Sequence, residues 1–493
     1  MLKIYGRRKR LCDGISRREL LTVGGSGLFA AASNPTYAAS PGHLPNFGKA
    51  KSCLLIFPYG SPSSHETFEP KPNAPAEVQG EMKAISSVLP GYPVCEHIPR
   101  IAKIMDKLTV VLSMKHPYPL HGLAYAVTGI PTYTPALETR ARDPKHWPFV
   151  GSIVDYLAAR NSNATPDIPR NIGLPWLVNS KTDNPAVNAG PFGAFLGAEF
   201  DPVWSDFDGR GLHIAPKNTV KQTKRFRNPF GGTTATGRFQ LSPAAELPEH
   251  MTVDRLRLRG SLLAQFDRQR QLSQHANVAA FGSQRQQAMA LLTSGRMRTA
   301  LDIGRESRKT RESYGMNLFG QSCLAARRVL QAGGKFVSVF WDCFGQFANG
   351  AWDTHQYHYP RLKQLLLPGF DQAFPTLLND LDQRGLLDQT LVVWMSEHGR
   401  TPKLVRNRPD GGRDHWSRAY AVALAGAGIA KGKVVGRTTR DGGDVLETPV
   451  SPKDILATIF HLMGIDPRTT VNDRLGRPRP IAGSGVVRPE LLA

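Results

Sequence analysis

Short apolar runs along the chain alternate with longer stretches whose apolar residues recur every three or four positions. The first pattern is typical of buried strands, and the second is typical of helices that cover a sheet. The predicted strands are 53–58, 108–114, 335–341, 390–395 and, with a weaker pattern, 419–425. The predicted helices include 256–274, 314–332 and 359–384. Strands that alternate with helices predict an α/β fold, in which a mainly parallel sheet is sandwiched by helices.

Residues 161–248 do not follow this alternation, because Pro, Gly, Asn and Thr dominate and periodicity is poor. We predict a long irregular insertion there, within a single domain over 40–493, and no second core. The insertion contains the basic run 221–227 (KQTKRFR), which we interpret as a solvated face, with contact to a polyanion as the alternative.

The N-terminal residues 1–39 have the layout of a twin-arginine signal peptide. Basic residues precede Ser16-Arg17-Arg18, a Gly- and Ala-rich apolar stretch follows, and small residues surround Ala38. The apolar stretch is too short to cross a bilayer core of about 30 Å, so we expect no stable membrane anchor. The pattern predicts export by the Tat translocase to the periplasm or the medium.

Composition removes several classes of function. The 493 residues are 41% hydrophobic and carry a formal charge of +22, from 62 basic and 40 acidic side chains. Wholesale disorder is therefore excluded. No aromatic-rich reader of single strands and no zinc-finger spacing accompanies the charge, so we predict no specific nucleic-acid binding and expect an anionic small molecule or polymer as substrate.

The five cysteines show no Cys-x-x-Cys spacing, which argues against a cysteine zinc site. One or two disulfides among Cys53, Cys95, Cys323 and Cys343 remain open at this stage.

Three segments that follow or lie near predicted strand ends each carry a carboxylate and an imidazole. These pairs are Asp353 with His355, Glu397 with His398, and Asp414 with His415. Any one pair alone is more often a hydrogen-bonded loop than a site. Three together favour a divalent metal site, because Zn²⁺ and similar ions take mixed nitrogen and oxygen ligands, and two ions would need about this many.

Several ordered motifs carry a family resemblance. They are 60–72, 120–129, WDTH at 352–355, GRTP at 399–402, GRDHW at 412–416 and 451–467. They resemble a secreted bacterial domain-of-unknown-function family (number 1501), which is itself similar to the alkaline phosphatase and sulfatase superfamily. The resemblance covers nearly the whole mature chain. It implies an alkaline phosphatase-like fold and a metal-dependent hydrolase of phosphate or sulfate esters.

The superfamily pattern, carried over by residue, implies two divalent ions, either Zn, Ca, Mg or Mn. One ion would be held by Asp353, His355 and His415, with His358 as a competitor for the role of His355. The other would be held by Glu66, Glu397 and His398.

The nucleophile is the open point of the resemblance. The superfamily places it nine residues before a Thr-Gly inside the following helix, and counting back from Thr128 gives Pro119, which has no nucleophilic side chain. A metal-activated hydroxide could attack directly. The nearby side chains that could serve instead are His121, His116, Ser113 and Ser63.

Two residues keep a structural alternative. His121 is a candidate catalytic group, but it could equally orient another side chain or be an ordinary packed histidine. Arg400 suits a bidentate grip on a phosphate or sulfate, and a salt bridge that supports the fold is equally consistent with the sequence. The alternative function is an inactive, metal-stabilised binding protein on the same fold.

Overall fold

The computed structural model describes residues 44–118, 122–130, 140–161, 166–179, 187–218, 223–241, 295–342 and 351–493. Within these residues, nine strands form one central sheet. In spatial order they are β15 (Lys433–Val435), β4 (Leu108–Met114), β14 (Tyr420–Ala425), β11 (Thr390–Trp394), β1 (Ser52–Pro58), β10 (Phe336–Trp341), β5 (Asn171–Leu174), β6 (Val203–Asp208) and β9 (Arg238–Leu241).

The sheet is mostly parallel around β1. This strand pairs in parallel with β10 on one side and with β11 on the other, and all of its residues are buried. A continuous apolar run such as SCLLIFP fits a strand that is covered on both faces. β14 is antiparallel to both β11 and β4, so the mainly parallel sheet of the prediction is confirmed with a mixed edge.

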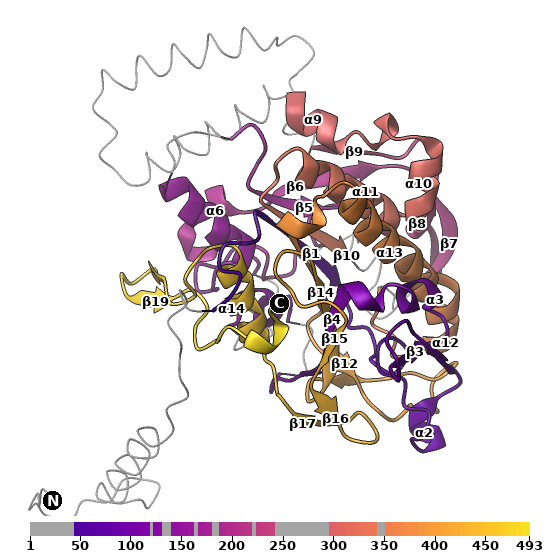
Figure 1. Ribbon diagram of the computed structural model, residues 1–493. Coiled ribbons are helices and arrows are strands. Elements are labelled where there is room, and N and C mark those ends of the chain that lie inside the picture. The colour runs from indigo at the N-terminus through magenta and orange to yellow at the C-terminus, as the bar shows by residue number, and fades with distance from the viewer. Residues whose placement is uncertain are drawn as a thin grey trace, which may run out of the picture. The chain divides into compact units, whose positions relative to one another are not determined.

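Helices cover both faces of the sheet (Figure 1). α11 (Leu318–Gln331) and α13 (Leu367–Gln383) lie on one side, and α6 (Val150–Arg160) and α14 (Pro452–Leu462) lie on the other. α14 begins with a capping box, in which the Ser451 hydroxyl accepts the backbone N–H of Asp454 and the Asp454 carboxylate accepts the backbone N–H of Ser451. The α/β sandwich of the prediction is therefore present.

The five predicted strands are confirmed as β1, β4, β10, β11 and β14, with bounds within a residue or two. The predicted helix 314–332 corresponds to α11. The predicted helix 359–384 contains α12 (His358–Arg361), a π-helical turn over Leu362–Leu366, and α13. The predicted helix 256–274 lies outside the described residues.

The stretch 161–248 differs in part from the predicted irregular insertion. It supplies β5, β6 and β9 to the central sheet, and β7 (Gly211–Asn218) pairs with β8 (Thr223–Thr233) in a separate two-stranded sheet. β5 and β9 have only four residues each, which is too short for a periodic pattern. Glycine at position 173 is more typical of a loop than of a strand. It is needed in β5 because a Cβ there would lie 2.4 Å from the Trp204 ring.

The predicted signal peptide, residues 1–39, lies outside the described residues. Cys53, Cys95 and Cys323 are buried free thiols, and Cys343 lies outside the described residues. In the described parts of the chain, no helix has both the length and the apolar character to cross a membrane.

Candidate metal centre

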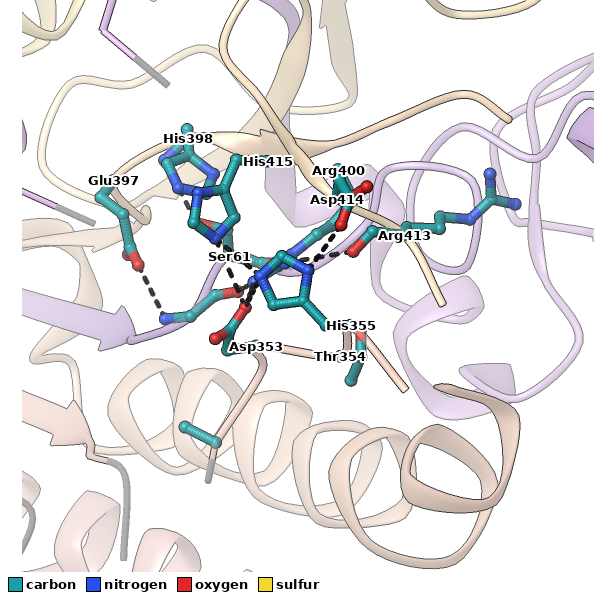
Figure 2. A network of polar contacts seen from close by, with 12 residues as sticks. Ser61, Asp353, Thr354, His355, Glu397, His398, Arg400, Arg413, Asp414 and His415 are labelled. Carbon is teal, nitrogen blue, oxygen red and sulfur yellow. Dashed lines mark hydrogen bonds and ion pairs between the residues drawn. The ribbon is translucent and has the colours of Figure 1, made fainter. Parts of the chain in front are cut away.

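The carboxyl ends of β1, β10 and β11 lie together, because Pro58 is in register with Trp341 and the three strands run in parallel. The chain that follows each strand therefore reaches the same edge of the sheet. A two-stranded sheet of β12 (Gly399–Arg400) and β13 (His415–Trp416) adds a fourth segment there. Figure 2 shows how these segments bring the predicted acid and histidine side chains together.

Asp353, His355 and His415 converge on one point. The Nε2 atoms of the two histidines are 2.9 Å apart, and they lie 3.1 Å (His355) and 3.6 Å (His415) from Oδ1 of Asp353. Tetrahedral zinc with bonds of about 2.05 Å separates nitrogen ligands by about 3.3 Å. Among the described residues, this is the one group of three whose ligand atoms all lie within 4.8 Å of one another. The three side chains, called the triad below, therefore fit a divalent ion.

Asp414 orients His355 from the side of the ring that faces away from the other two triad residues. Its Oδ1 lies 2.7 Å from Nδ1 of His355, and Arg408 holds the same oxygen at 2.6 Å. Partial burial raises the pKa of Asp414, but the hydrogen bonds from Arg408 and His355 lower it more, and the net pKa lies below its ordinary value. The ionised carboxylate fixes the proton of His355 on Nδ1, which leaves the lone pair of Nε2 for a metal. Asp414 thus contacts the ring nitrogen that does not face the triad.

Arg400 is buried under the loop that follows β1. Its Nε donates to the carbonyl of Ser61 at 3.0 Å, and its Nη1 donates to the carbonyl of Arg413 at 3.2 Å. Its Nη2 donates to the carbonyl of Gly60 and to Oδ1 of Asp353. These contacts make Arg400 a support of the site, and its grip on an ester stays a prediction.

Gly60 has a second structural role in the same loop. Its φ is +99°, and a Cβ there would lie 2.3 Å from the backbone nitrogen of Asp353. Only glycine therefore allows the β1 loop to approach the triad this closely.

Glu397 and His398 border the triad from the loop after β11. Oε1 of Glu397 accepts the N–H of Gly60 at 2.9 Å, and Oε2 accepts the hydroxyl of Ser396 at 2.6 Å. His398 donates from Nδ1 to the carbonyl of the next residue at 2.8 Å, and its ring centroid lies 4.6 Å from that of His415. Both residues therefore lie beside the triad, and their role as ligands of a second ion stays a prediction.

Glu66 lies in a different cluster. Its carboxylate pairs with Arg413 at 2.6 Å and lies 3.3 Å from Nε2 of His358, and all three side chains are at most 1% exposed. Burial raises the pKa of Glu66, but Arg413 and His358 lower it by more. The net pKa therefore lies well below its ordinary value. The structure therefore gathers Glu66 with Arg413 and His358, and it does not gather Glu66, Glu397 and His398 into a second group of the kind that the triad forms.

Of the candidate nucleophiles, His121 lies outside the described residues, as does Pro119. His116 is buried, with Nε2 at 2.7 Å from the carbonyl of Glu397. Burial lowers its pKa to about 4, although that carbonyl favours the charged form. Ser113 donates its hydroxyl to the carbonyl of Thr448, and Ser63 is buried in the β1 loop.

The sequence did not point to Ser61, which lies among the site residues in Figure 2. Ser61 is fully buried, has a φ of +68°, and accepts the backbone N–H of His398 on its hydroxyl at 3.3 Å. A non-glycine residue with this φ is strained and tends to occur at functional sites. The available signal was its place directly after a buried strand. Arg408 was also missed, because its contact with Asp414 depends on the folded loop.

The family described as "Protein of unknown function (DUF1501)" matches residues 50–492. The chain belongs to this family. A comparison with curated proteins found no match.

Three solved structures illustrate what the DUF1501 chain is similar to. Ps i-CgsB is 12% identical, with 84% of this chain and 72% of that chain covered and a TM-score of 0.37. The lipoteichoic acid synthase LtaP from Listeria monocytogenes is 9% identical, with 89% and 78% covered and a TM-score of 0.33. The PsFucS1 sulfatase from Pseudoalteromonas sp. is 17% identical, with 30% and 29% covered and a TM-score of 0.19. At TM-scores below 0.5, these likenesses establish neither activity nor substrate for this chain.

Proposed function

We propose that the chain is an exported, metal-dependent hydrolase of phosphate or sulfate esters, with its metal at the triad. The convergence of two imidazole nitrogens and one carboxylate oxygen carries the proposal. The ligand-orienting bond from Asp414 to His355 supports it, because metal-binding histidines commonly donate their other nitrogen to a carboxylate.

The donor set favours zinc or a similar ion, since two imidazoles and a carboxylate match its catalytic sites and leave a coordination position for water or substrate. A divalent ion bound there would polarise an ester oxygen and lower the pKa of a water ligand. His355 and His415 are partly exposed, so an ester can approach from their side. Asp353 is 4% exposed and fixed by Arg400, which keeps the carboxylate in place during that approach.

We propose one ion at the triad. Glu66, Glu397 and His398, which the family resemblance implies for a second ion, do not converge as the triad does.

Elemental analysis and turnover of aryl phosphate and aryl sulfate by the mature protein test the proposal. We expect about one divalent ion per chain, with both the metal and the turnover lost in Asp353→Ala and retained in the exposed control variant Asp388→Ala. Metal binding without turnover of any ester would favour the alternative of a metal-stabilised binding protein. Absence of metal after reconstitution would overturn the proposal.

Export is tested separately. Replacement of Arg17 and Arg18 by Lys in the full chain should retain the protein in the cytoplasm, because the paired arginines are the part of the signal that the Tat translocase requires. Unchanged export of this variant would contradict the Tat assignment.

A further inference from the structure

Glu66 contacts side chains from both loops that carry the triad histidines. Its Oε1 accepts Nη2 of Arg413 at 2.6 Å and Nε of the same side chain at 3.1 Å. Its Oε2 lies 3.3 Å from Nε2 of His358. Arg413 comes two positions before His415, on one loop. On the other loop, His358 comes three positions after His355. One carboxylate from the chain after β1 thus connects the two loops.

His358 extends this contact to the residue between Asp353 and His355. Its Nδ1 lies 2.7 Å from the hydroxyl oxygen of Thr354, which is 1% exposed. Burial lowers the pKa of His358, although Glu66 raises it, so the ring is neutral and carries one proton. The Glu66 carboxylate favours that proton on Nε2, and Nδ1 therefore accepts the hydroxyl of Thr354. Thr354 is thus held from the interior, next to two triad residues (Figure 2).

The backbones of the two loops also meet. The N–H of Arg413 donates to the carbonyl of Thr354 at 3.2 Å. A Cβ on Gly412 would lie 1.8 Å from the carbonyl oxygen of His355, so the two backbones are in direct contact. The guanidinium of Arg413 also donates to three backbone carbonyls, those of Val78, Thr401 and Pro402. The loop of His415 is therefore fixed on several sides.

Stability alone does not account for the buried charges. A buried ion pair costs desolvation energy, so it commonly adds no more stability than apolar residues of similar volume. The position of the pair accounts for it better, because the ligand atoms of the triad come from two separate loops. A metal site requires its ligand distances to within about 0.2 Å, so the two loops must be held in a fixed relation.

We propose that Glu66, Arg413 and His358 form a buried clamp that sets the place of His355 against His415, and that His358 acts through Thr354. His358 and Thr354 are then positioning residues of the metal centre. The inference rests on the proposed function, since it takes the triad as the metal site. It gives His358 no bond to the metal, in place of the ligand role that the sequence left open.

Zn²⁺ titration of Thr354→Val tests the clamp, because valine keeps the shape of the side chain and removes the hydroxyl. We expect Zn²⁺ to bind about tenfold more weakly, as is common when a contact behind a ligand is lost. Thr354→Ser keeps a hydroxyl and should restore the affinity. The matched control is Thr458→Val in α14, since Thr458 is 0% exposed and donates its hydroxyl to the carbonyl of Asp454 at 2.8 Å. This control should lose a comparable unfolding free energy without any change in Zn²⁺ affinity.

His358→Gln removes the same contact from the other side. The substituted amide keeps a nitrogen near Glu66 and has no group at the position of Nδ1. The double variant with Thr354→Val should therefore bind Zn²⁺ about as weakly as each single variant, because all three lack one contact. Each variant should still hold about one ion per chain at saturating Zn²⁺. The absorption spectrum of bound Co²⁺, which reports the ligand geometry, should change in these variants and stay native in Thr458→Val.

Native Zn²⁺ affinity in Thr354→Val, an equal loss in Thr458→Val, or additive losses in the double variant would each overturn the clamp. Loss of the ion from His358→Gln at saturating Zn²⁺ would show that His358 is a ligand, and would overturn it as well. If the native protein binds Zn²⁺ with the expected dependence but turns over no aryl ester, the clamp stands and the proposed hydrolase fails. A native protein that binds no Zn²⁺ would overturn both.

Discussion

Asp414 holds His355 by Nδ1 at 2.7 Å, so the other ring nitrogen faces His415 and Asp353. The carboxylate is itself fixed by Arg408 at 2.6 Å. This chain of two contacts sets both the ring orientation and the tautomer of a triad histidine before any ion arrives. Asp414 therefore acts on the metal through His355, as a positioning residue.

Replacement of Asp414 by Asn should weaken metal affinity by about 10- to 100-fold with little change in folding. The amide keeps the size of the side chain but loses the negative charge that favours the proton on Nδ1. Competition titration with a chelating indicator measures the affinity. Asp410→Asn, at an exposed position, is the control, and an equal loss in the two variants would contradict a positioning role for Asp414.

Gly60→Ala should displace the triad from the backbone side. The added Cβ would lie 2.3 Å from the nitrogen of Asp353, so either the β1 loop or the Asp353 loop must move. Gly333 is the matched control, because its φ of +108° is similar and a Cβ there meets nothing within 4 Å. Gly333→Ala should cost only the backbone strain, about 1–2 kcal/mol of unfolding free energy.

Urea unfolding and metal titration distinguish the two glycine variants. Gly60→Ala should lose more unfolding free energy than Gly333→Ala and should also lose metal affinity, since Asp353 shifts relative to the histidines. Native metal affinity in Gly60→Ala would show that the close approach does not position Asp353.

The long strands of the central sheet were predictable because a strand that is buried on both faces has a continuous apolar run. β1 and β4 illustrate this, since all of their residues are buried. β5 has four residues, one of which is a glycine placed against the Trp204 ring, and it has no comparable run. The antiparallel direction of β14 was also beyond the sequence, because direction depends on how the connecting chain crosses the sheet.

The candidate site was predictable in its residue types and only partly in its partners. Three acid and histidine pairs were expected to form a metal site, and the fold gathers Asp353, His355 and His415 from two of these pairs. The ion-pair partner of each carboxylate could not be predicted from neighbouring residues. Glu66, for example, pairs with Arg413, which is distant in the sequence. Likewise, the neighbours Asp414 and His415 contact different ring nitrogens of His355, Nδ1 and Nε2. Their adjacency in the sequence does not reveal this difference.

Stability should fall as the pH drops from about 6.5 to about 4, in part because of His116. Burial lowers its pKa to about 4 in the folded state, against an ordinary value of 6.5. Over this range the unfolded chain binds the proton and the folded chain does not, so protons favour unfolding. The loss from this residue approaches about 3 kcal/mol and levels off below pH 4.

Urea midpoints measured from about pH 7.5 to about pH 4.5 test this dependence. His116→Asn should flatten the curve in part, since His65 also has a pKa lowered to about 4, first by its burial and then by Arg413. A His116→Asn curve that matches the native one would contradict the neutral, buried state of His116.

Glu66→Gln separates a structural carboxylate from a metal ligand. The substitution leaves the Arg413 guanidinium buried without its counter-charge, so we expect a loss of about 3–5 kcal/mol of unfolding free energy. Metal content should stay at that of the native protein, because Glu66 is not part of the triad. Glu312→Gln, which breaks an exposed pair with Arg308, should change the free energy of unfolding far less. If Glu66→Gln instead binds about one ion fewer than the native protein while remaining folded, Glu66 ligates a second ion, and the single-ion centre proposed for the triad is wrong.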